Sequence, residues 1–270
     1  MYRSLKTLLM AGGLSLVTIA SVAAVELQWY GQSAFKITTV TGKVIIIDPF
    51  ISNNPKTPEA LKDLSTIDKI DLILVTHGHG DHVGDTATLA EMFGAKVGMN
   101  ADMGSTFRAL GIIPGKKLIR FNKSGPIKPI GEGITITMVR AEHSSTVTHK
   151  DPATGKKHVY NGGEPSGYII ELENGFKIYH AGDTGVFGDM AFIGSYYKPD
   201  LALLPIGGHF TMDPAHAAYA VSNLLKPKMV MPMHYGTFGV LKGTPDQFKK
   251  ALGNYAGKVI VMNPGDIQKF

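Results

Sequence analysis

The sequence predicts an α/β fold in which helices cover two mixed β-sheets. Short apolar runs typical of buried strands alternate with segments of helical periodicity along most of the chain. Turn signals join several of these runs into hairpins, so the sheets cannot be purely parallel. Neither a low-complexity linker nor a short repeat divides the sequence. Two facing sheets with helices outside them fit this order of elements.

The first half of the chain is rich in strand signals. Gly42 supplies the turn of an expected hairpin. The run 71–76 is short, apolar and β-branched, which favours a buried strand. Residues 59–64 predict one or two helical turns, and 85–93 has helical spacing that ends at Gly94. The strands expected in this half are 26–30, 34–40, 43–48, 71–76 and 96–99.

The second half repeats this pattern. Asn174 and Gly175 favour a tight hairpin turn between two apolar runs. Residues 214–225 predict a helix, because Pro227 follows its end. Residues 143–166 are polar and rich in glycine, which is typical of a long loop. The strands expected here are 134–141, 168–173, 176–180, 201–205, 229–232 and 258–262.

Composition excludes several classes of function. Hydrophobic residues make up 44% of the chain and charged residues 18%, as in an ordinary globular protein. The formal net charge is +5, but no run of Lys and Arg is interleaved with aromatic residues, so we expect no nucleic-acid partner. The chain has no cysteine, which excludes disulfides, thiolate ligands and a cysteine nucleophile. Any transition-metal site must therefore use histidine and carboxylate.

The N-terminus predicts an export signal. Arg3 and Lys6 precede a largely apolar stretch, which ends in small residues before Val25. We interpret residues 1–24 as a signal peptide and 25–270 as a single metallo-hydrolase domain. An uncleaved membrane anchor is the alternative. Cleavage would leave an exported protein, periplasmic or secreted, with no stable membrane span.

The segment with the strongest chemical signal is T-H-G-H-G-D-H at positions 76–82, directly after a predicted buried strand. It places His77, His79, Asp81 and His82 within six positions. Gly78 and Gly80 let the backbone turn tightly and approach a ligand. Neutral imidazole and carboxylate are ligands that suit zinc, manganese or iron. This spacing predicts a metal site, because an incidental polar loop would not concentrate such side chains.

Three further residues are expected to complete the site. His143, Asp183 and His234 each follow a predicted strand. Strand ends that face one rim could bring these side chains to the 76–82 cluster. Each of the three residues taken singly would more often be structural, but together with the first cluster they indicate metal binding.

These motifs resemble the metallo-β-lactamase-fold hydrolases. The resemblance rests on T-H-G-H-G-D-H, on His143, on Asp183 in A-G-D-T-G and on His234 in P-M-H-Y-G-T, and it extends to Asp48 in I-I-I-D-P. It covers essentially the whole chain after the signal. More narrowly, L-P-I-G-G-H-F-T-M at 204–212 and G-G-E-P-S-G-Y at 162–168 are similar to a little-characterised branch near the ascorbate-phosphate lactonases.

The resemblance implies an αββα sandwich with its site at one edge of two facing sheets. It also implies two divalent metal ions, for which we expect Zn2+, with Mn2+ or Fe2+ as alternatives. The implied ligands are His77, His79 and His143 for the first ion, Asp81, His82 and His234 for the second, and Asp183 as a bridge between them.

The resemblance implies hydrolysis of an ester, lactone or phosphodiester bond of a small molecule. Two divalent ions that share a water lower its pKa towards 7, and the resulting hydroxide can attack a carbonyl or phosphoryl centre. Asp81 would orient this nucleophile and could accept its proton. His209 follows a strand at the same kind of position as the ligands, so it is a candidate proton donor or substrate contact, or else a loop histidine. Asp48 is expected to fix a ligand by a hydrogen bond, or simply to form a turn.

Alternatives remain open at this stage. A β-lactamase-type amide hydrolase is possible on this scaffold, although the absence of cysteine departs from one lactamase subgroup. Di-iron redox relatives resemble a different ligand set, with glutamate where this chain has His79. A non-catalytic metal-binding protein is the third alternative. Lys150, Lys156 and Lys157 in the 143–166 loop could attract an anionic substrate, and nothing in the sequence indicates an oligomeric state.

Overall fold

The structure is a computed structural model that describes residues 24–270. The predicted signal segment, 1–24, therefore lies outside the described residues except for Ala24. Among the residues described, no helix has the length and apolar character needed to cross a bilayer.

Two β-sheets face each other, as the sequence predicts. The first has seven strands in the order β14-β1-β2-β3-β4-β5-β6. It is antiparallel from β14 to β3 and parallel from β3 to β6. Its strands are β1 (Glu26–Gly31), β2 (Ala34–Thr38), β3 (Val44–Ile47), β4 (Leu72–Leu74), β5 (Lys96–Asn100), β6 (Leu118–Phe121) and β14 (Ile267–Lys269).

The second sheet has five strands in the order β13-β12-β11-β10-β7. Strands β11, β12 and β13 are parallel, whereas β10 is antiparallel to both β11 and β7. Its strands are β7 (Thr135–Arg140), β10 (Ser166–Glu171), β11 (Lys177–His180), β12 (Leu201–Pro205) and β13 (Met229–Met233). The hairpin expected at Asn174 and Gly175 is confirmed as β10–β11, with Gly175 at a φ of 80°.

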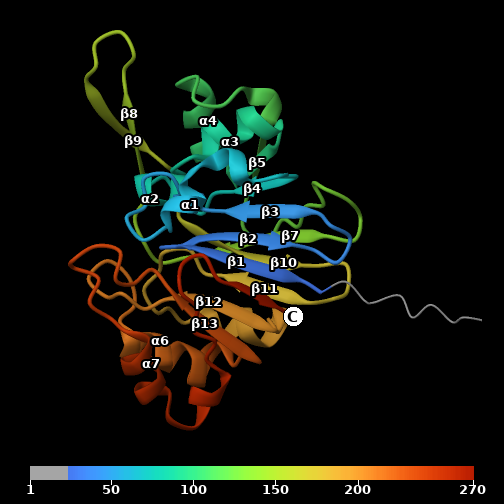
Figure 1. Ribbon diagram of the computed structural model, residues 1–270, viewed down its shortest axis with the longest axis vertical. Coiled ribbons are helices and arrows are strands. Elements are labelled where there is room, and N and C mark those ends of the chain that lie inside the picture. Colours follow the sequence, from blue (N-terminus) through green and yellow to red (C-terminus); the bar gives the residue numbers. More distant parts are fainter. Residues whose placement is uncertain (1–23) are drawn as a thin grey trace, which may run out of the picture.

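Helices cover the outer faces of the sheets, with α3 and α4 on one side and α6 and α7 on the other (Figure 1). The α-helices are α1 (Glu59–Lys62), α2 (Gly80–Val83), α3 (Thr86–Phe93), α4 (Ala101–Ala109), α5 (Met190–Phe192), α6 (Pro214–Tyr219) and α7 (Pro245–Leu252). Two π-helical segments, η3 (Ile193–Tyr197) and η4 (Ala220–Leu225), continue α5 and α6, so the helix expected at 214–225 is present. Short 3-10 turns are η1 (Leu64–Thr66), η2 (Gly115–Lys117) and η5 (Gly253–Lys258).

The period of two in the strands divides the core into two layers. Ile45 and Ile47 of β3 pack in the layer between the sheets, which also holds Tyr168 of β10. Ile46 points the other way, into a cluster with Leu89 of α3 and other helix side chains. Because both faces of β3 are covered, all four of its residues are buried, which explains its continuous apolar sequence.

Two expectations for the elements are wrong. Residues 258–262 form no strand, because only Val259 makes an isolated bridge, to Val230 of β13. The last strand of the chain is β14, which pairs with β1 at the edge of the first sheet. Part of the 143–166 segment is a β-hairpin, β8 (Thr146–Lys150) with β9 (Lys157–Asn161), rather than an irregular loop. This hairpin projects from the body (Figure 1) and is mostly exposed. Its strands therefore lack the apolar alternation that makes a strand readable in sequence.

Candidate metal centre

All seven residues expected to bind metal come together at one end of the sandwich. Strands β4, β7, β11 and β13 carry them at their carboxyl ends, where the chain leaves each sheet. The residues are His77, His79, Asp81 and His82 after β4, His143 after β7, Asp183 after β11 and His234 after β13. The α2 helix starts inside the first cluster, so Asp81 and His82 project from its first turns.

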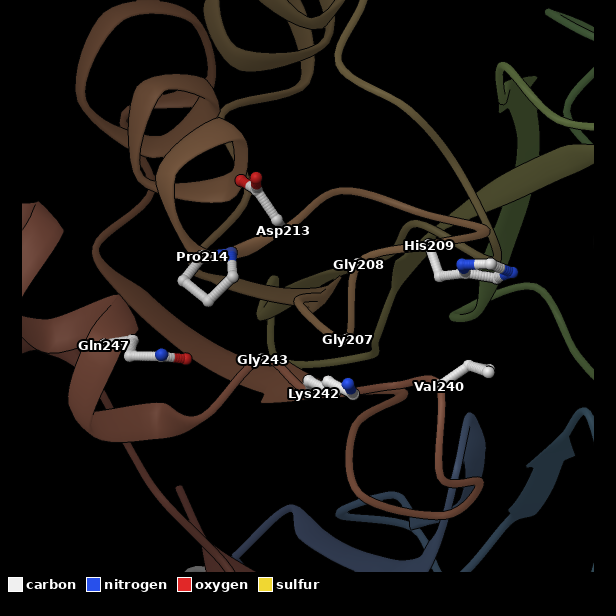
Figure 2. A pocket seen from close by; sticks show the side chains of 9 residues that line it. All are labelled: Gly207, Gly208, His209, Asp213, Pro214, Val240, Lys242, Gly243 and Gln247. Atoms are coloured by element: carbon white, nitrogen blue, oxygen red, sulfur yellow. The ribbon is translucent and has the colours of Figure 1, made fainter.

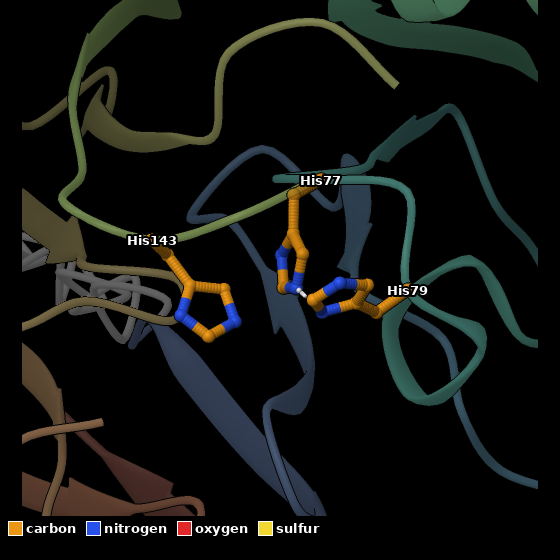
Figure 3. A group of neighbouring side chains, drawn as sticks. All are labelled: His77, His79 and His143. Atoms are coloured by element: carbon orange, nitrogen blue, oxygen red, sulfur yellow. Dashed lines mark hydrogen bonds between the residues drawn. The ribbon is translucent and has the colours of Figure 1, made fainter. Parts of the chain in front are cut away.

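The first group consists of His77, His79 and His143. One ring nitrogen from each lies within 4.8 Å of the others. Figure 3 shows the three rings converging from two separate loops. The His77 Nε2 and His79 Nδ1 atoms are 3.0 Å apart. Three lone-pair nitrogens so close together are typical of a metal site.

The second group consists of Asp81, His82 and His234, whose potential ligand atoms also lie within 4.8 Å of one another. The two imidazole rings stack with their centroids 5.7 Å apart. Asp81 Oδ2 lies 3.8 Å from His82 Nε2 and 3.6 Å from His234 Nε2.

Asp183 lies between the two groups. Its Oδ1 atom is 3.2 Å from His82 Nε2, and its Oδ2 atom is 3.0 Å from His234 Nε2. The same Oδ2 is 3.6 Å from His143 Nε2 in the first group. A carboxylate that contacts both groups is placed where a bridging ligand would lie.

The electrostatics of the cluster favour a cation. Burial would lower the pKa of His82, but the carboxylates of Asp183 and Asp48 outweigh it and hold this pKa well above its usual value. The pKa of His234 is raised to about 9, because Asp183 outweighs the effect of burial. Burial would raise the pKa of Asp183, yet His234 and His82 hold it well below its usual range. Without a metal, protons on His82 and His234 supply the positive charge that the carboxylates need.

Asp48 and Thr76 fix the orientation of two histidines, as expected for Asp48. The fully buried Asp48 carboxylate accepts a hydrogen bond from His82 Nδ1 at 2.7 Å and another from the Thr76 hydroxyl at 2.7 Å. Since the hydroxyl donates to Asp48, it accepts from His77 Nδ1, which is 3.0 Å away. With a metal bound, both histidines would therefore keep their proton on Nδ1 and direct the lone pair of Nε2 into the cluster.

Gln32 is a positioning residue that the sequence did not reveal. It is fully buried in the β1–β2 turn, with a φ of 50°. Its side-chain amide donates to Asp81 Oδ2 at 2.9 Å, and its carbonyl accepts the backbone N–H of His234 at 3.0 Å. One residue therefore holds two members of the second group. A glutamine in a turn between strands carries no sequence signal for this role.

His180 has a structural role. It is buried, and its Nδ1 accepts the backbone N–H of Gly182, so its Nε2 donates to the carbonyl of Ser33 at 2.9 Å. Gly182 has a φ of 62°, and a Cβ there would meet the carbonyl oxygen of Ser166 at 2.6 Å. The loop that presents Asp183 can therefore only be built with glycine at this position.

The two glycines of the first cluster differ. A Cβ on Gly78 would lie 2.8 Å from the carbonyl oxygen of Thr146, so glycine allows the close approach of these two backbone segments. A Cβ on Gly80 would meet no atom within 4 Å. The expectation that both glycines let the backbone approach a ligand stays a prediction.

The cluster opens into a cavity of about 600 Å³. His79, Asp81, His143, Asp183 and His234 line it, while His77 and His82 lie buried behind them. The Lys residues of the 143–166 segment are not among its lining residues. The anionic substrate expected from them therefore stays a prediction without support from the cavity.

His209 lies outside the seven-residue cluster. It is exposed and lines a neighbouring pocket with Asp213 and Lys242, shown in Figure 2. Its ring packs edge to face on Phe210, which does line the metal cavity, with 4.4 Å between ring centroids. The assignment of His209 as proton donor or substrate contact stays a prediction.

The seven residues fit divalent metal ions. His82 Nε2, Asp183 Oδ1 and His234 Nε2 are buried polar atoms without a hydrogen-bond partner. Such atoms are costly unless something satisfies them. Cations accept these lone pairs, and a set of imidazoles and carboxylates without thiolate suits zinc, manganese or iron.

Comparison with known proteins agrees with this arrangement. Residues 43–235 match the family described as "Beta-lactamase superfamily domain". A UPF0173 metal-dependent hydrolase of Polaromonas sp. is 53% identical over 245 residues, which cover 91% of this chain and 89% of that protein. The corresponding hydrolase of Cupriavidus necator is 54% identical over 243 residues, or 89% of this chain and 84% of the relative.

A solved structure shows the same fold. Igni18, a metallo hydrolase of the archaeon Ignicoccus hospitalis, is 39% identical, with a TM-score of 0.78 over 92% of this chain and 98% of that chain. The chain is thus a metal-dependent hydrolase of the metallo-β-lactamase superfamily. Within that class it belongs to the UPF0173 metal-dependent hydrolases.

Proposed function

We propose that this protein is a dinuclear hydrolase that cleaves an ester, lactone or phosphodiester bond in a small molecule. The observation that carries the proposal is the position of Asp183 between two groups of three ligands. A carboxylate in this position can act as a bridging ligand only if each group binds its own cation. Zinc is the ion that we propose for both positions, since the ligand set consists of nitrogen and carboxylate oxygen.

When bound, two divalent cations lower the pKa of a shared water and stabilise negative charge on the oxygen of the bond under attack. The protein's own residues position this chemistry. Asp81 is the ligand best placed to accept a proton, because its side chain is 24% exposed and lines the cavity. Gln32 holds one oxygen of that carboxylate, leaving the other free to face the nucleophile.

The test is a turnover screen of the zinc-loaded protein against esters, lactones, thioesters, β-lactams and phosphodiesters. We expect hydrolysis of at least one ester, lactone or phosphodiester, and loss of that turnover by about 10²-fold or more in Asp81→Asn. Asp102→Asn, which changes an exposed carboxylate on α4, is the control and should keep full turnover. If only β-lactams are hydrolysed, the proposed bond type is wrong and the protein is an amide hydrolase. If Asp81→Asn and Asp102→Asn are equally active, Asp81 is not the proton acceptor.

We further propose that residues 1–24 direct export to the periplasm or the medium. The support is the basic start, the apolar stretch and the small residues before Val25. Fractionation of cells that express the full chain, followed by mass spectrometry of the N-terminus, tests this proposal. We expect a protein that starts at Val25 outside the cytoplasm, whereas an intact Met1 start in the cytoplasm would refute export.

A further inference from the structure

The metal cavity has an aromatic mouth. Besides the potential ligands, its lining residues are Gly80, Ser144 and three phenylalanines, Phe50, Phe210 and Phe238. The Phe210 side chain is 58% exposed and the Phe238 side chain 40% exposed. Exposed aromatic residues that gather at one cavity, with polar groups converging at its floor, are typical of a ligand-binding site.

The rings of Phe210 and Phe238 stand on two loops that are tied together. The backbone N–H of Gly243 donates to the carbonyl of Gly207 at 3.1 Å. A Cβ on Gly243 would lie only 1.8 Å from the carbonyl oxygen of Ile206, so the two loops approach each other as closely as backbones can. The loops that carry the two rings are therefore joined to each other at their backbones, which reduces the entropy cost of binding a ligand between them.

The backbone around Phe50 is fixed by hydrogen bonds of its own. The Asp85 carboxylate accepts the backbone N–H groups of Ile51 and Ser52, both at 2.9 Å. The backbone N–H of Phe50 donates to the carbonyl of Asp48 at 2.7 Å, next to the carboxylate that orients His82. Phe50 therefore belongs to the same rigid segment as the metal cluster.

Within residues 24–270, no lysine or arginine lines this cavity. The neighbouring pocket beside His209 contains Lys242, and a separate hollow that shares His143 contains Lys123 and Arg140. The latter two are already paired there, Lys123 with Glu164 and Arg140 with Glu142. A negative charge on the non-reacting part of a substrate would therefore find aromatic rings and one serine hydroxyl instead of a cationic partner.

We propose that the substrate carries an uncharged apolar group, aryl or branched alkyl, that packs between Phe50, Phe210 and Phe238 while its scissile bond lies over the metal cluster. This inference rests on the proposed hydrolytic centre and gives it a substrate class. It disfavours substrates whose remaining part is phosphorylated or carboxylated, because burying an unpaired charge against aromatic rings is costly.

The test uses three metal-chelating probes that share a hydroxamate group and differ in the rest of the molecule. Acetohydroxamate, benzohydroxamate and 3-carboxybenzohydroxamate are titrated into the zinc-loaded protein by calorimetry, and hydrolysis of methyl acetate and phenyl acetate is measured in parallel. We expect benzohydroxamate to bind about tenfold more tightly than acetohydroxamate, because its ring is buried, and the added carboxylate to remove most of this gain. Phe210→Ala and Phe238→Ala should each reduce the ratio of benzohydroxamate affinity to acetohydroxamate affinity by about two- to tenfold.

Phe192→Ala is the matched control, because Phe192 is 52% exposed on α5 and does not line the cavity. It should leave all three affinities unchanged. Equal binding of acetohydroxamate and benzohydroxamate, stronger binding of the carboxylated probe, or equal effects of the Phe192 and Phe210 variants would each overturn the inference. An aromatic preference without turnover of any ester, lactone or phosphodiester would support the aromatic subsite and refute only the proposed reaction. No binding of any probe would refute both.

Discussion

Replacing Gln32 by alanine should loosen the second metal position without unfolding the protein. The substitution removes one side-chain hydrogen bond, from Gln32 Nε2 to Asp81 Oδ2 at 2.9 Å. A hydrogen bond to a charged group contributes about 1.5–3 kcal/mol, and partners that orient metal ligands typically change metal affinity by about 10–100-fold. We therefore expect the dissociation constant of the second ion to rise by about 10–100-fold, and that of the first ion to stay nearly unchanged.

The backbone contacts of Gln32 protect the fold in this variant. Its carbonyl still accepts the N–H of His234 and the indole N–H of Trp29, because alanine keeps the main chain. Gln28→Ala is the matched control, since Gln28 is 7% exposed on β1 and its amide contacts Gly265 instead of the cluster. Metal titrations by calorimetry would show the difference. If both variants bind the second ion as tightly as the unchanged protein, the orienting role assigned to Gln32 is wrong.

Four further predictions concern the same centre. Asp183→Asn should reduce bound zinc from two ions to one or fewer per chain by elemental analysis, because an amide bridges cations poorly; two retained ions would exclude the bridge. Removing metal with a chelator should lower the melting temperature by about 5–10 °C relative to protein at 100 times the dissociation constant. Since the pKa of His234 is raised to about 9, the metal-free protein should lose stability as pH rises from 6.5 towards 9, while zinc affinity increases, and a flat melting profile would contradict this sign. His209→Ala should keep both ions but lower turnover, and full turnover would exclude a catalytic role.

Much of the metal cluster could be predicted from the sequence because each ligand follows a buried strand. Strand β4 ends at Leu74, three positions before His77, and β13 ends directly before His234. Runs of this kind can be recognised locally, and the parallel order of β11, β12 and β13 brings their ends to one edge.

The remaining features depend on contacts that no local pattern encodes. Gln32 reaches Asp81 across 49 positions of the chain. Phe210 and Phe238 are single aromatic residues in polar loops, and only the packing of those loops brings them to one cavity. The run 258–262 has the apolar character of a strand, but its neighbour β13 pairs with it only at Val259. Strand pairing of this kind is decided by tertiary packing and not by propensity.

The most direct measurement is the anomalous diffraction of a crystal of the zinc-loaded protein, recorded above and below the zinc edge. The account predicts two zinc peaks, one contacted by His77, His79 and His143 and the other by Asp81, His82 and His234, with Asp183 touching both. A single peak, or a pair of peaks in which Asp183 contacts only one ion, would contradict the proposed dinuclear centre.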